Sequence, residues 1–363
     1  MLGWLLTLAA LVIVQQYGDR SAIGTLAMYA PRHLTPWPWL VPVALATLLS
    51  WRWVLASALG FVVTLLGVAS FNVPLGKVDA QQSPPAHPEA APQSPPAQPD
   101  AAPLSPPAQP DAAPLSPPAQ PAADTLPPLR IVTYNTDGSH ALADRIVADA
   151  TAWNADLAVL IDCRASVAEA LRSLPGYRLL QTDFYCLLTR HDVVRARRMP
   201  PAITAIARAA GSGRAGRVHQ LELRVHGHPI TVYPLHLETP RTALWAARNL
   251  DLSQLGQNAA IRAFDSQVAS RFVDRTAPGL IVLGDFNLDV NSAIYRRDWG
   301  DLTNAWSAAG LGFGHTMFAG RHRVRIDHIL LGPGWTVDSV QVLRGYPSEH
   351  QPVVVSVHGN GRH

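Results

Sequence analysis

One apolar run late in the chain is followed by two polar side chains of the kinds that bind metals and phosphates. Residues 280–283 read Leu-Ile-Val-Leu, between a Pro-Gly pair and a glycine. The run predicts a strand buried on both faces, although its periodicity also fits a buried helix. Asp285 and Asn287 follow, and at a spacing of two they point the same way if the backbone stays extended. A carboxylate suits a hard cation and an amide N–H suits a phosphoryl oxygen, whereas a simple Asp/Asn turn is an equally good explanation.

Polar side chains also stand at the ends of other apolar segments, or in the loops that follow them. They are Asn135, Asp137, Asp162, His236, Asp327, Glu349 and His350. Taken singly, Asn135 and Asp137 can cap a turn, and His236 can be an interior histidine with satisfied hydrogen bonds. Asp327 needs a partner, because it lies inside an apolar strand and a buried carboxylate is costly unless it is paired. With the two residues after the 280–283 run, these positions predict one convergent site.

The segments that carry these residues predict a domain of mixed strands and helices. Strands are expected at 129–135, 156–162, 184–189, 218–225, 229–237, 280–285, 325–331 and 353–357, and helices at 141–153, 167–174 and 241–274. Such an order is typical of an α/β or α+β sandwich of two sheets flanked by helices. Residues 129–363 are enough to bury one large core.

The first 76 residues are very apolar and predict transmembrane helices, three in our interpretation. The segments are 2–17, 35–50 and 53–74, and the last is free of charge and long enough to cross a bilayer. Tryptophans lie at the segment ends, where interfacial aromatic residues belong. We interpret Trp51-Arg52-Trp53 as a tight cytoplasmic turn, which puts everything after residue 75 outside. A cleaved signal peptide fits less well, because a basic leading segment is missing.

Residues 77–128 form a Pro/Ala-rich linker. Within it, residues 83–126 are four tandem copies of an eleven-residue unit that begins Ser-Pro-Pro-Ala. The units carry almost nothing to bury, so a folded repeat array is not expected. As polyproline II at ~3.1 Å per residue, the repeats could extend on the order of 140 Å. We interpret the segment as a semi-rigid spacer, with a ligand for a Pro-binding module as the alternative.

Charge and cysteine content restrict the partners and the compartment only mildly. The residues after 128 hold 25 of the 29 basic and 20 of the 26 acidic residues, and this net charge of +5 is compatible with an anionic substrate or a membrane surface and too small to argue for nucleic acid. Cys163 and Cys186 are the two cysteines of the chain. In an exported domain they would be a disulfide candidate, and in the cytosol two buried thiols.

Residues 129–358 resemble the endonuclease/exonuclease/phosphatase superfamily, whose members hydrolyse phosphate esters with Mg²⁺. The matching motifs, in order, are Arg130-Ile-Val-Thr-Tyr-Asn135, Asp156 to Asp162, Leu235-His236-Leu237, Gly284-Asp-Phe-Asn287, Arg325-Ile-Asp-His-Ile-Leu330 and Ser348-Glu-His-Gln-Pro-Val353. Apolar helices followed by this domain further resemble a membrane-anchored bacterial envelope branch of the superfamily, some members of which are associated with glycopeptide resistance.

The resemblance implies a metal site. Asp162, helped by Asn135 and by Asp137 or Glu349, would hold Mg²⁺, with Mn²⁺ as the second candidate ion. Two positions depart from the family pattern. The second motif normally ends in Glu where Asp162 stands, and the last normally has Asp where Glu349 stands. Both substitutions keep the charge, so metal binding is expected with a shifted geometry.

The resemblance also implies the acid–base groups. His350 would be the general base for the attacking water, with Asp327 fixing its tautomer and orientation. Asp285 would position the nucleophile or protonate the leaving oxygen. Asn287 and His236 would donate hydrogen bonds to the charge that develops on phosphorus.

The sequence thus predicts a membrane-tethered, metal-dependent phosphoric ester hydrolase, with its catalytic domain outside a bacterial inner membrane. A lipid-linked phosphate or pyrophosphate is the expected substrate, because a soluble substrate gives no reason for membrane helices. An extracytoplasmic nuclease is the alternative, but nucleic acid is not expected as a partner, since the seven arginines of residues 190–217 come with few aromatic platforms. A non-catalytic binding module on a stalk is the third hypothesis. No protein partner is inferred.

Overall fold

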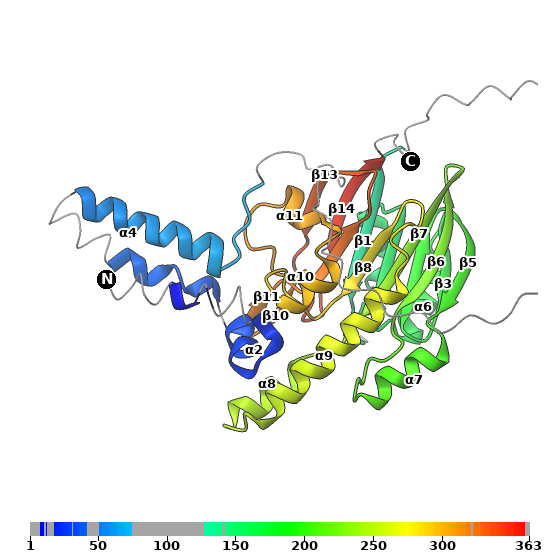
Figure 1. Ribbon diagram of the computed structural model, residues 1–363. Helices are drawn as coiled ribbons and strands as arrows, with labels where there is room; N and C mark the ends of the chain where they lie inside the picture. The colour runs from blue at the N-terminus through cyan, green and yellow to red at the C-terminus, as the bar shows by residue number, and fades with distance from the viewer. Residues whose placement is uncertain are drawn as a thin grey trace, which may run out of the picture.

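The computed structural model describes residues 8–10, 12, 18–30, 32–41, 51–74, 127–139, 142–320 and 322–359. The expected repeats of the linker and most of the first two apolar segments lie outside these ranges. Within them, two six-stranded mixed sheets pack face to face and helices cover their outer sides (Figure 1). The predicted two-sheet sandwich flanked by helices is therefore confirmed.

The first sheet has the strand order β13-β14-β1-β2-β4-β3. Its strands are β1 (Leu129–Asn135), β2 (Leu157–Ile161), β3 (Arg178–Gln181), β4 (Tyr185–Thr189), β13 (Trp335–Val342) and β14 (Val353–Gly359). β1 and β2 run parallel, with Asn135 opposite Ile161. The carboxyl ends of the two central strands therefore meet at one edge of the sheet.

The second sheet has the order β5-β6-β7-β8-β12-β9. Its strands are β5 (Asp192–Arg198), β6 (His219–Val225), β7 (His228–His236), β8 (Ile281–Asp285), β9 (Thr303–Asn304) and β12 (Asp327–Leu331). A separate hairpin joins β10 (Met317–Ala319) to β11 (His322–Val324). The register sets Asp285 opposite both His236 and Asp327.

Alternate side chains of the strands build the core between the sheets and the two cores outside them. Ile131 and Val159 of the first sheet share the central core with Leu283 and Ile329 of the second. This double burial explains why the run at 280–283 is apolar throughout.

Helices cover the outer face of each sheet. α5 (Ile146–Trp153) and α6 (Ala165–Arg172) pack on the first, and α9 (Ser253–Phe272) and α10 (Ala293–Trp299) on the second. Three further helices are α7 (Pro201–Ala209), α8 (Arg241–Arg248) and α11 (Ala305–Ala309). The single helix expected over 241–274 is broken between α8 and α9, where Leu250 has a positive φ of 65°.

The described N-terminal residues contain one helix that is long and apolar enough to cross a membrane, at Trp51–Val68. It consists of α4 (Trp51–Val63) continued by a π-helical turn η5 (Thr64–Val68). Trp51-Arg52-Trp53 begins this helix, so it is not the turn that we expected. Before it come α2 (Ala22–Tyr29) and the 3₁₀ turns η2 (Gly18–Arg20), η3 (Arg32–Leu34) and η4 (Trp37–Trp39).

The chain on both sides of the apolar segments packs against the sandwich. Asp19 of η2 forms an ion pair of 2.9 Å with Arg262 of α9, and both side chains are buried. After α4, Asn72 exchanges two backbone hydrogen bonds of 2.9 Å with Gly312. Asn72 and β1, the described parts of the chain on either side of residues 75–126, therefore both contact the sandwich.

Candidate active site

The site lies at the edge where β1, β2, β7 and β8 end, and one hydrogen bond joins the two sheets there. Asn135, the last residue of β1, donates from Nδ2 to Oδ2 of Asp285, the last residue of β8, over 2.9 Å. Both residues are buried. The ends of β1 and β8, which both carry polar side chains after an apolar run, are thus in direct contact.

The turn after β8 depends on its glycine. Gly284 has a φ of 140°, and a Cβ there would lie 2.1 Å from the Leu235 carbonyl oxygen of β7. No other residue fits so close an approach of two strands. Asn287 then adopts a positive φ of 49°, and its backbone N–H donates to Asp285 Oδ1 over 2.9 Å. The Asx turn, one of the two explanations of this stretch, is present, and both Asp285 and Asn287 line the cavity described below.

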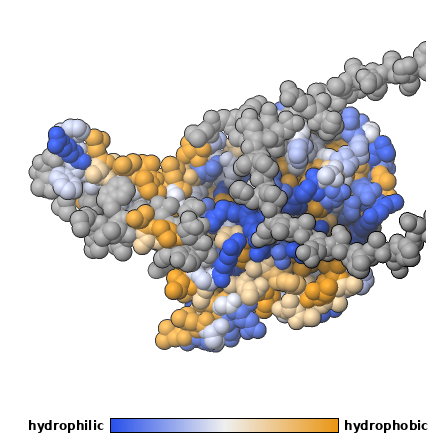
Figure 2. Space-filling model, in the orientation of Figure 1, coloured by the Kyte–Doolittle hydropathy of each residue, from blue (hydrophilic) through white to orange (hydrophobic). Residues whose placement is uncertain are grey.

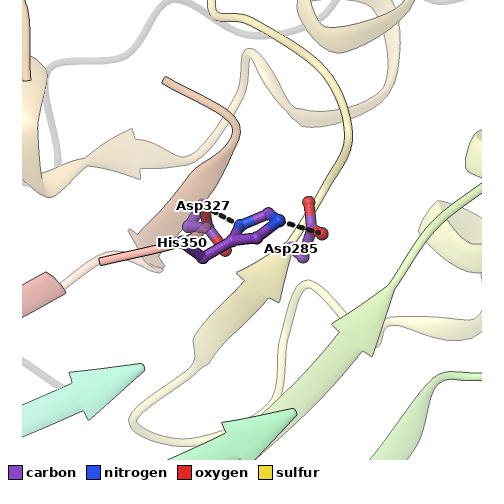
Figure 3. A group of neighbouring side chains, drawn as sticks. All are labelled: Asp285, Asp327 and His350. Atoms are coloured by element: carbon purple, nitrogen blue, oxygen red, sulfur yellow. Dashed lines mark hydrogen bonds and ion pairs between the residues drawn. The ribbon is translucent and has the colours of Figure 1, made fainter. Parts of the chain in front are cut away.

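His350 and Asp327 form a buried pair beside Asp285 (Figure 3). His350 Nδ1 lies 2.8 Å from Asp327 Oδ2, and its Nε2 faces Asp285 Oδ2 at 3.8 Å. Burial opposes a charge on the imidazole, but the carboxylates of Asp327 and Asp285 outweigh it and raise the pKa of His350 to about 9. Burial, and then the Asp327 carboxylate, raise the pKa of Asp285.

The loop before β14 holds His350 in place. Ser348 Oγ donates to the Asn135 carbonyl oxygen over 2.8 Å and accepts from the backbone N–H of His350 over 3.0 Å. The serine of the last motif therefore links the histidine to β1.

His236 connects the centre of the site to Asp162. Its Nε2 lies 3.5 Å from Asp285 Oδ2 and its Nδ1 3.4 Å from Asp162 Oδ2. The imidazole is buried, but it is not the isolated interior histidine that was one explanation of its sequence position.

Asp162 is surrounded by cations. Arg217 donates to its Oδ1 over 2.7 Å, and Arg214 to its Oδ2 over 3.4 Å. Burial raises the pKa of this carboxyl group, but the hydrogen bond and charge of His236 and the two guanidinium groups outweigh it, so the pKa falls well below its usual value. Both carboxylate oxygens are thus already engaged.

Asp137 and Glu349 lie at the margin of the site. Both line the cavity described below, and Asp137 donates its backbone N–H to Asn135 Oδ1 over 2.9 Å. Glu349 forms an ion pair of 2.7 Å with Arg241 of α8, and its side chain is 42% exposed. Glu349 therefore connects the last motif to α8.

A cavity of about 1120 Å³ opens beside these groups. Asn135, Asp285, Asn287 and His350 line one part of it. Its other lining residues include apolar side chains of α2, α8 and the β10–β11 hairpin, namely Leu26, Leu244, Trp245, Met317 and Val324. The space combines a small charged region with a larger apolar one.

The charged region suits a divalent cation. One ligand atom each of Asp285, Asp327 and His350 lie within 4.8 Å of one another. Asp327 Oδ1 is buried and has no hydrogen-bond partner in the structure. Two adjacent carboxylates with an unpaired buried oxygen, beside the amide oxygen of Asn135, are the hard donors that Mg²⁺ binds.

Several residues that contact the site were not recognised from the sequence. Arg214 and Arg217 fall in an arginine-rich stretch without a recognisable motif, and their contacts with Asp162 bridge more than fifty residues. Tyr29 donates its hydroxyl to the Asn287 carbonyl oxygen from residues 18–34, which lie between the first two transmembrane segments that we expected. The charged Asp19-Arg20 pair between the two apolar segments was the signal available.

The fold and this polar centre are of the kind found in a family whose members are phosphoesterases. The family model of the endonuclease/exonuclease/phosphatase family matches residues 132–350, and the chain belongs to this family. The match includes every predicted site residue from Asn135 to His350, which agrees with the resemblance seen in the sequence motifs.

Solved structures with similar folds are distant in sequence. TDP2 from D. rerio, in complex with a single-stranded DNA product, is 15% identical with a TM-score of 0.50, covering 64% of this chain and 99% of that one. The mannosyl-6-phosphatase Bt3783 from Bacteroides thetaiotaomicron is 16% identical with a TM-score of 0.45, covering 63% and 99%. A family protein from the same bacterium is 15% identical with a TM-score of 0.47, covering 64% and 95%. Among curated proteins, none matches the chain.

Proposed function

We propose that this protein is a metal-dependent phosphoesterase whose general base is His350. The observation that supports this most directly is the buried Asp327–His350 pair, with the free Nε2 of the histidine turned toward Asp285 inside a substrate-sized cavity. A histidine held at Nδ1 by a carboxylate presents Nε2 in a fixed orientation for a proton.

The other proposed roles follow from which atoms face the cavity. Nε2 of His350 accepts the proton of the attacking water, and Asp327 stabilises the imidazolium that results. Asp285 either orients that water or protonates the leaving oxygen. Asn287 and His236 donate to the phosphoryl oxygens as charge develops on them. The Arg214 guanidinium, which also lines the cavity, adds a positive charge at the same place.

We propose Mg²⁺ as the cofactor, with Mn²⁺ as the alternative, held by Asp285 and Asn135, with Asp137 at the cavity. Glu349 could join them only if it left its ion pair with Arg241. Bound there, the ion would polarise a phosphoryl oxygen. Asp162 was expected as the main ligand, but its two oxygens are engaged by Arg214, Arg217 and His236. In this arrangement Asp162 can bind the metal only if it gives up its contact with one of these two arginines.

The finer proposal is a membrane-tethered enzyme of the bacterial envelope branch, acting on a lipid-linked phosphate or pyrophosphate outside the inner membrane. Three features support it. The helix at Trp51–Val68 can span a bilayer. The cavity has a large apolar part. Cys163 and Cys186 form a disulfide, which is typical of proteins in oxidising compartments.

Nucleic acid is the second candidate substrate. The D. rerio TDP2 structure holds a single-stranded DNA product on the same fold, so the expectation that nucleic acid is not a partner needs a direct test. In favour of the lipid, most apolar side chains that line the cavity are aliphatic, with Tyr29 and Trp245 as the aromatic exceptions.

The test is phosphate release by the full chain in detergent micelles, with Mg²⁺ or with a chelator. The substrates are a polyprenyl pyrophosphate, a phospholipid and a DNA duplex with a single-stranded end. His350→Ala removes the proposed base, and His358→Ala is the matched control, because His358 pairs with Asp338 on β13. Turnover that needs Mg²⁺, survives the control and falls about 100-fold or more in His350→Ala is the expected result. DNA as the preferred substrate would replace the lipid, and unchanged turnover in His350→Ala would refute the proposed base.

A further inference from the structure

The cavity beside the candidate site opens between helices that leave large apolar side chains in water. On α8 and the turn that follows it, Trp245 is 65% exposed, Leu250 90% and Leu252 52%. On α2, Ile23 is 69% exposed and Leu26 37%. We call these five residues the apolar rim. Of the five, Leu26, Trp245 and Leu252 also line the cavity, so the rim surrounds its entrance.

Leu250 is the least expected member of the rim. It holds a large apolar side chain almost entirely in water on a backbone with φ of 65°. A left-handed conformation is unfavourable for a residue with a Cβ. Leu250, between α8 and α9, is therefore unfavourable in water on two counts, its exposed side chain and its backbone conformation. A contact that buries the side chain would offset them.

The rim lies on the side of the domain from which α4 extends. Figure 1 shows α2 and the free end of α8 at the same side of the sandwich as α4. Figure 2 shows apolar surface over α4 and again over α2 and α8 on that side. A bilayer crossed by α4 would therefore meet the rim.

The charges around the rim suit a lipid headgroup region. Arg241 and Arg248 stand at the two ends of α8, with Trp245 between them, and both are exposed; Arg241 also pairs with Glu349, whereas Arg248 lies next to the rim. Tryptophan and leucine beside arginine are typical of helices that lie in a membrane interface, where the arginines contact anionic headgroups.

We propose that the apolar rim lies in the surface of a lipid bilayer, so that the cavity opens at the boundary between lipid and water. A phosphate ester could then reach the site while its apolar part stays in the membrane. The inference rests on the proposed membrane span of α4, and the part about substrate entry rests on the proposed phosphoesterase activity.

Site-directed fluorescence in vesicles tests the position of the rim. Both native cysteines are in the disulfide, so one introduced cysteine is the one free thiol for a polarity-sensitive label. The full chain is reconstituted into phosphatidylcholine–phosphatidylglycerol vesicles with or without lipids that carry a quencher. Leu250→Cys reports the rim and Leu59→Cys reports α4. Glu169→Cys on the exposed surface of α6 is the control.

We expect quenching by lipid at positions 250 and 59 and none at 169. Quenching at 59 without quenching at 250 would overturn the rim proposal and keep the span. No quenching at either would overturn both. A label at 250 that becomes buried without quenching would mean that a second copy covers the rim, which also overturns the proposal.

Turnover provides the second readout. Ile23→Ser with Leu250→Ser removes two rim side chains that do not line the cavity. We expect this variant to hydrolyse a vesicle-embedded lipid phosphate roughly tenfold more slowly, because less apolar area anchors the entrance in the bilayer. A short water-soluble phosphate ester should react as before. Equal loss on both substrates, or no loss on either, would refute the membrane entry. Absence of all turnover in the unmodified chain would instead refute the phosphoesterase, while the quenching data still decide the position of the rim.

Discussion

Burial and charge act in opposite directions on the pKa of His350, and the charge effect comes mainly from two neighbouring carboxylates. Burial alone lowers the pKa of an imidazole, and here the carboxylates of Asp327 and Asp285 reverse that effect. Asp327 is the closer of the two, at 2.8 Å. The metal-free imidazole is therefore protonated at neutral pH. For His350 to serve as a base, its pKa has to fall when metal and substrate bind in the site.

Asp327→Asn should lower the pKa of His350. The substitution keeps the size of the side chain and removes the nearest negative charge, so burial dominates again. We expect the metal-free His350 to titrate well below the value of about 9 expected for the unmodified protein. NMR of histidine-labelled protein in chelator measures this directly. An unchanged titration would mean that Asp327 does not set the pKa.

Asp265 predicts a separate effect of pH on stability. Burial, against hydrogen bonds from Glu238 and Ser212, raises its pKa from 3.8 to about 6. Between these values the folded state binds more protons than the unfolded state, so the free energy of unfolding falls as pH rises, by about 3 kcal/mol in total. Asp265→Asn should remove this decrease. Denaturant unfolding at pH 4 and pH 6 of both proteins measures the difference, and parallel losses in the two would contradict the assignment.

The sequence could predict which polar residues lie close together, because each belongs to a short motif at or near the end of a strand. Asn135, Asp285 and His350 meet as expected from the rule that strand ends converge. The partners of Asp162 could not be predicted, because Arg214 and Arg217 reach it from a loop and no local pattern encodes contacts across fifty residues. The sequence also could not show that Tyr29 touches the Asn287 turn.

At the scale of helices and strands, burial decided which elements were predictable. β8 and β12 are buried throughout and were expected. β5 was assigned to a loop, because nearly all of its side chains are exposed and its arginine-rich sequence has no apolar face. The break between α8 and α9 was missed because residues 249–252 contain neither Gly nor Pro, and Leu250 takes the positive φ instead.

The contact of η2 and α2 with α9 yields a prediction at this scale. Arg262 is 1% exposed, and its Nη2 donates to Asp19, Tyr29 and the Asn287 carbonyl oxygen. Asp19→Leu would leave a buried guanidinium without its counter-ion. We expect a loss of about 3–5 kcal/mol in the free energy of unfolding. Asp19→Leu with Arg262→Met should recover much of that loss, since an apolar pair replaces the ion pair.

Thermal unfolding of the single and double variants in detergent measures both changes. The control is Asp338→Leu, which breaks the more exposed pair with His358 and should cost less than about 1 kcal/mol. If Asp19→Leu costs no more than this control, the N-terminal segment does not pack on α9 in solution.

The disulfide makes a further prediction about β2 and β4. Cys163 follows the end of β2 and Cys186 lies in β4, and their link closes a loop with a sequence separation of 23. By the loop-entropy relation, replacing both with Ala should lower stability by about 3 kcal/mol. Denaturant unfolding with and without a reductant tests this. Reductant should destabilise the native chain and leave the double Ala variant unaffected.

At the scale of the whole molecule, one site is assembled from two parts of the chain that are far apart in sequence. Residues 18–30 supply Tyr29 to the Asn287 turn and Met28 to a small core with Val324 and Ile326, while residues 127–359 supply the sandwich.

These contacts are noncovalent, so the two parts should assemble even when the chain between them is cut. We therefore expect residues 77–363, produced alone, to be less stable and less active than the full chain, and co-expression with residues 1–76 to restore both. Co-purification and phosphate release measure the restoration. Residues 1–76 carrying Asp19→Arg should fail, because a second cation would face the buried Arg262. Full activity of residues 77–363 alone would show instead that the sandwich is complete by itself.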